Sequence, residues 1–246
     1  MSNWRSGPSQ IEYLNIEDIP GNVRATVVSK YFIQILDLDF NGPLIPNKPR
    51  LNHCTARLIF ENDIPNDSEV FPGAKQVYID LEFYGEFEFK TVRGLLNVKP
   101  HWNTNPSPRS VKNFEISVAA GATVEDFLSV LDKHHMVPCG FNTQNSDAKG
   151  CKDFTSQFTY RLIQEGVLNV PADGLFELFQ TFNPNYGPGE LSRPGTVGYA
   201  AFNAQYHERH MKINGIEYSG DRISRDSAEG RAIEYEPANI EIQRQG

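Results

Sequence analysis

The chain lacks the features that mark secreted and membrane proteins. Its first residues, MSNWRSGPSQ, contain no apolar stretch of the kind found in a signal peptide. No apolar run elsewhere approaches the ~18–20 residues that a membrane-spanning helix needs. We therefore expect no membrane span and a cytoplasmic location.

Cysteine and basic clusters are also scarce. The three cysteines, Cys54, Cys139 and Cys151, follow no regular spacing, which argues against a disulfide framework and favours a reducing, intracellular setting. The net charge is −8, and no block of lysine or arginine stands out. Such a chain is poorly suited to bind nucleic acid, so we expect no nucleic-acid partner.

Several catalytic and cofactor motifs are missing. The sequence contains no GxGxxG, GxxxxGK[ST] or GxSxG, so nothing indicates a nucleotide or an α/β-hydrolase site. Two histidine patterns occur, the pair His207 and His210, and His134–His135 near Cys139. Neither matches the ligand spacing of a zinc or iron site, and adjacent histidines on a helix cannot both reach one ion. We expect neither a metal nor a cofactor.

What remains is an ordinary globular composition of 246 residues, 39% hydrophobic and 22% charged, enough for one large core. Strand patterns fill the first half and helical periodicity follows. This order predicts an α+β fold, an antiparallel β-meander packed against two or three helices. We expect an irregular N-terminal arm over 1–22, a single domain over 23–206 and a polar C-terminal tail over 207–246.

Two predicted strands carry polar residues of interest. NHCTARLIF alternates between an apolar face and a face that holds His53. QVYIDLEFY alternates in the same way and places Tyr78, Asp80 and Tyr84 on its polar face. Antiparallel neighbours would bring His53 and Asp80 within cross-strand reach.

Three helices are predicted after the strands. The first is capped by Thr123, follows an i, i+3, i+4, i+7 apolar pattern and ends near His134. The second begins at Cys151, directly after a glycine, and ends at Gly166. The third covers residues 173–182.

Cys151 stands in the first turn of its predicted helix, where free backbone N–H groups and the helix dipole favour a thiolate. Thiol catalysis also needs a base and a residue that orients it. His53 is the candidate base, and Asp80 is the candidate orienting residue, with Asn97 or His101 as alternatives.

Other residues complete the candidate site. Gln144 is a candidate oxyanion donor beside the Cys151 N–H. Tyr78 and Tyr84 are candidate substrate contacts, near aromatic residues that either line an apolar pocket or fill the core. Cys151 has a structural alternative too, since it begins an apolar helical stripe and unpaired cysteines are among the most buried residues.

The strand Asn52-His53-Cys54, the β-meander and the helix opening GCKDF resemble circularly permuted papain-like proteins, which include the NlpC-related and lecithin:retinol acyltransferase-like groups. The chain also resembles an uncharacterised group of fungal proteins. The resemblance spans residues 23–182 and implies that His53 is the base, Asp80 its orienting partner and Cys151 the nucleophile. Asp80 stands where a histidine or asparagine is more often found.

These observations predict thiol-dependent acyl transfer or hydrolysis of an amide, ester or thioester small molecule, with secondary metabolism as one setting. Two other classes fit the same residues. One is a non-catalytic binding module of the same fold, in which Cys151 is a core residue. The other is a cofactor-free cyclase or isomerase with an aromatic pocket.

Overall fold

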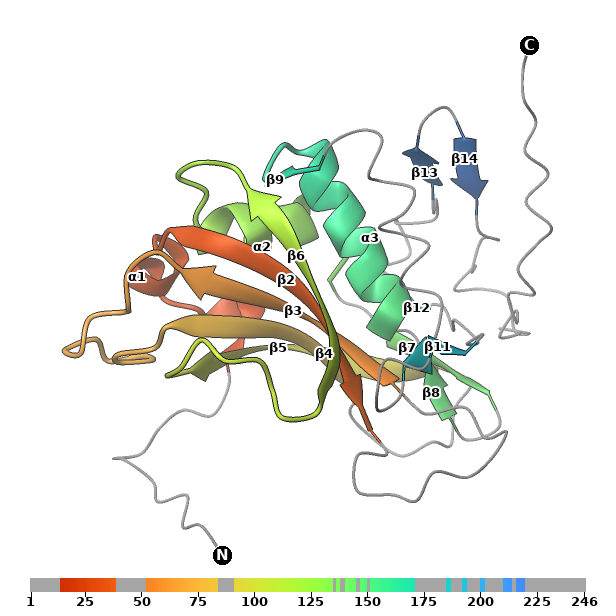
Figure 1. The fold of residues 1–246 in the computed structure, drawn as a ribbon, viewed down its shortest axis with the longest axis horizontal. Helices are drawn as coiled ribbons and strands as arrows, with labels where there is room; N and C mark the ends of the chain where they lie inside the picture. The colour runs from red at the N-terminus through yellow and green to blue at the C-terminus, as the bar shows by residue number, and fades with distance from the viewer. Residues whose placement is uncertain are drawn as a thin grey trace, which may run out of the picture.

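The computed structural model describes residues 14–38, 52–83, 91–134, 136–137, 140–144, 147–149 and 151–170, and the short strands of 185–219 given below. A curled antiparallel sheet carries two helices on one of its faces (Figure 1). The predicted α+β class and antiparallel meander are confirmed in these residues.

The sheet follows the order β12-β7-β5-β4-β3-β2-β6-β9. Its centre is formed by long strands, namely β2 (Val28–Asp37), β3 (Asn52–Phe60), β4 (Gln76–Phe83), β5 (Thr91–His101) and β6 (Ser110–Val118). Shorter strands extend its edges: β1 (Leu14–Asn15), β7 (Gly140–Gln144), β8 (Asp147–Lys149), β9 (Leu168–Asn169) and β12 (Ala200–Ala201). Two separate pairs are β10 (Asn185–Tyr186) with β11 (Ser192–Arg193) and β13 (His210–Ile213) with β14 (Ile216–Ser219).

The helical elements are η1 (Ile16–Asp18), α1 (Gly21–Arg24), α2 (Val124–Lys133) and α3 (Cys151–Gln164). α2 and α3 begin at the positions that the sequence predicted. The backbone N–H of Thr123 donates to the Asp126 carboxylate at 2.7 Å, which caps α2. Gly166, with φ +74°, follows α3 in the left-handed conformation that commonly ends a helix.

Some expected boundaries shift. The polar stretch PHWNTNPSPRSVKN, residues 100–113, has the composition of a loop, but only 102–109 connect the strands, because Pro100 and His101 still pair with β4 and β6 starts at Ser110. The expected irregular arm contains β1, η1 and α1, and β1 pairs with β5. The predicted helix over 173–182 lies outside the described residues.

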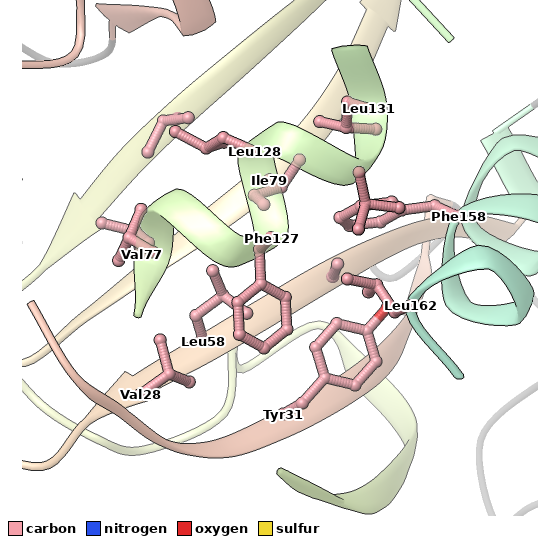
Figure 2. Packing of buried hydrophobic residues seen from close by; sticks show 14 of the residues in the cluster. Val28, Tyr31, Leu58, Val77, Ile79, Phe127, Leu128, Leu131, Phe158 and Leu162 are labelled. Atoms are coloured by element: carbon pink, nitrogen blue, oxygen red, sulfur yellow. The ribbon is translucent and has the colours of Figure 1, made fainter. Parts of the chain in front are cut away.

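The apolar face of the sheet packs against α2 and α3 (Figure 2). The Tyr31 ring stacks on Phe127 of α2 with 5.8 Å between centroids. Leu58, Phe158 and Leu162 are fully buried in the same cluster. Burying one side chain of this size stabilises a fold by about 1.5–3 kcal/mol, so this layer holds the helices on the sheet.

A chain of hydrogen bonds fixes α3 over β3. The Thr159 hydroxyl donates to the Thr155 carbonyl at 2.7 Å. Its proton is therefore used, and the Tyr31 hydroxyl must be the donor in the 2.8 Å bond to Thr159 Oγ1. One turn earlier, Thr155 Oγ1 donates to the Cys54 carbonyl at 3.4 Å. These bonds set where the first residue of α3, Cys151, meets the sheet.

The opposite, polar face of the sheet is only partly open to solvent: Lys30 and Glu115 have side chains that are 51% and 53% exposed, whereas polar residues of β4 are buried. Tyr78 is 6% exposed and Asp80 is 8% exposed. The connection over 102–109 meets this side at Gln76, whose Nε2 donates to the Asn105 carbonyl at 3.5 Å. Asp80 is covered by His53 and Lys99, and Tyr78 by the ring of His101. These polar side chains are therefore buried, although alternation alone would leave them open to water.

Candidate active site

The site lies where two central strands separate. The backbone pairing of β3 with β4 ends at Ala56 and Ile79, whereas β3 stays paired with β2 as far as Asn52. Beyond that point a side-chain hydrogen bond takes the place of backbone hydrogen bonds between β3 and β4: Thr55 Oγ1 donates to the Ile79 carbonyl at 2.9 Å. Among the described residues, no strand pairs with this edge of the first residues of β3, and Cys151 at the start of α3 meets it at the Cys54 N–H.

His53 and Asp80 bridge the separated strands. Nε2 of His53 is hydrogen-bonded to Oδ1 of Asp80, and the side chains are 17% and 12% exposed. On its other oxygen, Asp80 accepts from Lys99 Nζ at 3.1 Å. Burial raises the pKa of Asp80, but the His53 charge, its hydrogen bond and Lys99 outweigh burial and lower that pKa to about 2. Asp80 is a carboxylate at neutral pH.

Cys151 is hydrogen-bonded to His53 through the two side chains. Nε2 of the imidazole is occupied by Asp80, so Nδ1 is the nitrogen left for the thiol. The backbone N–H of Cys54 provides a second hydrogen bond to the Cys151 sulfur. The three side chains thus form a continuous line from carboxylate to imidazole to thiol.

The electrostatics favour a thiolate–imidazolium pair. Burial raises the pKa of Cys151, but the His53 charge and hydrogen bond, the Cys54 N–H and the Lys152 charge together lower it below its usual value. For His53, burial lowers the pKa, and the charges of Asp80 and Cys151 overcome this effect and raise the pKa well above its usual value. Each member of the pair stabilises the charged form of the other.

Cys54 provides an internal contrast. Its thiol is buried among apolar residues, and burial followed by the nearby Cys151 charge raises its pKa to about 12. Burial lowers the pKa of Lys152, while the charges of Cys54 and Cys151 oppose that shift. The two neighbouring cysteines therefore have pKa values shifted in opposite directions, because only Cys151 is hydrogen-bonded to the imidazole.

The other predicted site residues are distributed as follows. Tyr78 lies on the same face as Asp80, and its ring meets His101 edge-on with 4.6 Å between centroids. Asn97 is opposite Asp80 in the β4–β5 register, so neither alternative orienting residue takes the place of Asp80 at His53. Gln144 ends β7, and its side chain lies outside the described residues, as does all of Tyr84.

Sequence reasoning missed three contributors: Lys99, the Cys54 N–H and Thr155. Lys99 was hidden because its partner, Asp80, is 19 residues away on the neighbouring strand. The Cys54 N–H can donate to the Cys151 sulfur only because β3 and β4 are no longer paired at this residue. No sequence pattern predicts where two strands stop pairing. Thr155 lies one turn after Cys151, a spacing that a helical reading of the sequence could have used.

In the part of the chain that the structure describes, no three His, Cys, Asp or Glu side chains are grouped to hold a metal ion. His134, one of the weak candidates, is hydrogen-bonded through Nε2 to Glu165 at 2.8 Å. The helices in the described ranges are too short or too polar to cross a membrane. His135, Cys139 and His207 lie outside these ranges.

Comparisons with protein-family models, with curated proteins and with solved structures found no match for this chain. The chemistry of the site therefore rests on the geometry of its own residues. Within that geometry, a thiol, an imidazole and a carboxylate are connected in that order.

Proposed function

We propose that this protein is a cysteine-dependent hydrolase or acyltransferase with a permuted papain-like arrangement, acting on a small-molecule amide, ester or thioester. The observation that carries the proposal is the connected line Asp80–His53–Cys151 at the start of α3. A buried core cysteine has no need of an imidazole and a carboxylate aligned behind it.

In the first half of the reaction the Cys151 thiolate attacks the carbonyl carbon and forms a tetrahedral oxyanion. Free backbone N–H groups at the start of α3 would donate to this oxyanion, as the first turn of a helix leaves such groups without intrahelical partners. When the intermediate collapses, the bond to the leaving group breaks, and the His53 imidazolium gives its proton to that group. An acyl-thioester on Cys151 remains.

In the second half, water or an acceptor nucleophile attacks the thioester carbonyl. Neutral His53 takes the proton of the nucleophile, and the thiolate leaves with its electron pair. Asp80 stays ionised throughout, since its pKa lies near 2, and it holds the ring orientation and favours the imidazolium. Hydrolysis and acyl transfer differ only in which nucleophile enters.

The test is the pH dependence of iodoacetamide alkylation, followed separately for each cysteine by peptide mass spectrometry. In the wild type we expect Cys151 to react rapidly at pH values below the ordinary thiol range. In His53→Ala the profile should move to higher pH, and at a fixed pH below the Cys151 pKa the rate should fall about tenfold for each unit by which that pKa rises. Cys54 serves as the internal control and should stay unreactive in both proteins.

A Cys151 profile that is ordinary in the wild type and unchanged by His53→Ala would sink the proposal and favour a core role. Fast labelling with an activity that survives Cys151→Ala would instead favour a cyclase or isomerase that uses ordinary acid–base residues. Hydrolysis of p-nitrophenyl decanoate, abolished by Cys151→Ala, would complete the positive case.

A further inference from the structure

Cys54 is a second thiol beside the candidate nucleophile, and the proposed reaction leaves it unused. Both Cys54 and Cys151 are free cysteines. Cys54 belongs to the apolar cluster between the sheet and the helices, and Cys151 packs against that cluster. Cys54 is only 2% exposed, whereas Cys151 is partly exposed, so a small reagent in solvent meets Cys151 first.

Two contacts place Cys54 against the first turn of α3. The backbone N–H of Cys54 donates to the Cys151 sulfur, so only Cα and Cβ of Cys54 lie between that N–H and the Cys54 sulfur. Thr155 lies one turn after Cys151 on the same side of α3. Its hydroxyl is hydrogen-bonded to the Cys54 sulfur and, at 3.4 Å, to the Cys54 carbonyl. The two sulfurs therefore lie at the same turn of α3, on the side that faces β3.

The backbone at Cys54 can adjust to a bond between these sulfurs. A disulfide needs two Cα atoms about 4.4–6.8 Å apart, and the hydrogen bond from the Cys54 N–H to the Cys151 sulfur brings the two backbones close to this spacing. Cys54 pairs with Ile35 of β2, but the pairing of β3 with β4 extends only to Ala56. A small shift of Cys54 toward α3 therefore breaks no backbone hydrogen bond between β3 and β4.

The charges at the site favour a first reaction at Cys151 and a second at Cys54. While Cys151 is a thiolate, its charge adds to burial in raising the pKa of Cys54, so Cys54 stays a protonated thiol. Oxidation of Cys151 to a sulfenic acid removes that negative charge, whereas the charge of Lys152, which lowers the pKa of Cys54, remains. Direct contact offsets the effect of burial, because a neighbouring group reacts as if it were very concentrated.

We propose that Cys54 and Cys151 form a reversible disulfide when the protein meets hydrogen peroxide. The Cys151 thiolate attacks one peroxide oxygen, the O–O bond breaks, hydroxide leaves and Cys151 becomes a sulfenic acid. The Cys54 sulfur then attacks the Cys151 sulfur. The S–S bond forms, the S–O bond breaks, and the Cys54 proton leaves with the hydroxyl group as water. Two thiols are oxidised and one peroxide is reduced.

The disulfide would hold the protein in an inactive form that a thiol reductant restores. Cys151 cannot attack a carbonyl while its sulfur is bonded to Cys54. The bond also protects Cys151 from further oxidation to a sulfinic acid, which thiols do not reduce. This inference rests on the proposed Cys151 thiolate for its first step, and it assumes nothing about the substrate.

The test treats the full chain with hydrogen peroxide, blocks the remaining thiols with iodoacetamide and maps non-reduced peptides by mass spectrometry. We expect wild type to give a peptide pair joined through Cys54 and Cys151, and dithiothreitol to restore iodoacetamide labelling of Cys151. Cys54→Ala retains the backbone N–H but has no second sulfur. In this variant the labelling of Cys151 should be lost and not restored, because Cys151 passes on to sulfinic acid. Each variant is compared with its own untreated sample.

Cys139→Ala is the matched control, since it removes the third cysteine of the chain by the same substitution. It should give the same joined peptides and the same recovery as wild type. A disulfide from Cys151 to Cys139 or to a second copy of the chain overturns the proposal. Recovery in Cys54→Ala that equals recovery in wild type overturns it too.

A failure of the disulfide is distinguishable from a failure of the thiol enzyme. If Cys151 of untreated wild type labels rapidly but peroxide gives no joined peptides, the disulfide is overturned and the thiolate stands. That result needs wild type only, so it holds even if Cys54→Ala does not fold. If Cys151 labels as an ordinary thiol, diamide at a pH above the ordinary thiol range replaces peroxide. Joined peptides then support the disulfide without the enzyme, and their absence overturns both.

Discussion

His53 and Asp80 form their hydrogen bond at the point where β3 and β4 cease to pair. The bond therefore spans a gap in the sheet that backbone hydrogen bonds leave open, and it draws the Cys151 thiol of α3 into contact with the imidazole. The opening in the sheet and the candidate catalytic line are one feature.

Asp80→Asn should uncouple this line. Without the carboxylate, burial acts on His53 with less opposition, so we expect the pKa of His53 to fall and that of Cys151 to rise. Imidazole chemical shifts of labelled histidine, followed by NMR against pH, measure the first change. Lys99→Met is the control: it removes the other partner of Asp80 but leaves the His53 pKa high, and a fall of similar size in both variants contradicts the assignment.

Acid should destabilise the protein through Asp80. Its pKa is lowered in the folded state from 3.8 to about 2, so its stabilising contribution is present above pH ~4 and is lost as pH falls toward 2. The shift corresponds to about 2 kcal/mol for a carboxylate that is 12% exposed. Urea unfolding between pH 2 and 6 should give a steeper loss for wild type than for Asp80→Asn.

The exposed pair of Lys30 and Glu115 supplies the comparison for that experiment, with side chains that are 51% and 53% exposed. Glu115→Gln should follow the wild-type curve closely, because water screens such a pair. If the free energy of unfolding falls equally with pH in wild type and in Asp80→Asn, the folded state does not lower the pKa of Asp80.

The Tyr31–Thr159 bond should show a directional asymmetry. Tyr31→Phe removes a donor and should cost about 1 kcal/mol, whereas Thr159→Val leaves the buried Tyr31 O–H unsatisfied and should cost about 2–3 kcal/mol. The double variant should lose less than the sum, as measured by urea denaturation. Additive losses would mean that the two hydroxyls act separately.

Phe127 should carry much of the attachment of α2 to the sheet. It is fully buried and stacked on Tyr31, so Phe127→Ala should lower the free energy of unfolding by about 3–5 kcal/mol. Ser129→Ala, at an exposed position on the same helix, should change it by less than about 0.5 kcal/mol. Chemical denaturation measures the free energy of unfolding of both variants. If Phe127→Ala lowers it as little as Ser129→Ala does, Phe127 is not a main contact between α2 and the sheet.

Alternation and helical periodicity predicted the elements of the site because both are local properties. His53 and Asp80 were placed on matching faces of adjacent strands, and Cys151 at a helix start, from residue spacing alone. The burial of Asp80 could not be predicted in this way, since it depends on His53 and Lys99, which lie on the neighbouring strands and far away in the sequence.

The sequence by itself determined the strands, the two helices and which faces their side chains occupy, because steric and hydrophobic periodicity act over a few residues. Only the tertiary structure decided that β3 and β4 separate, that Cys151 enters the gap and that Arg57 lies buried beside Phe32. These outcomes depend on contacts between residues far apart in the chain. Each element is compatible with several arrangements, and packing and charge pairing between elements determine which one forms. The lowered pKa of Cys151 belongs to that second group, because its largest favourable cause is His53, held by Asp80, and both residues lie far from Cys151 along the chain.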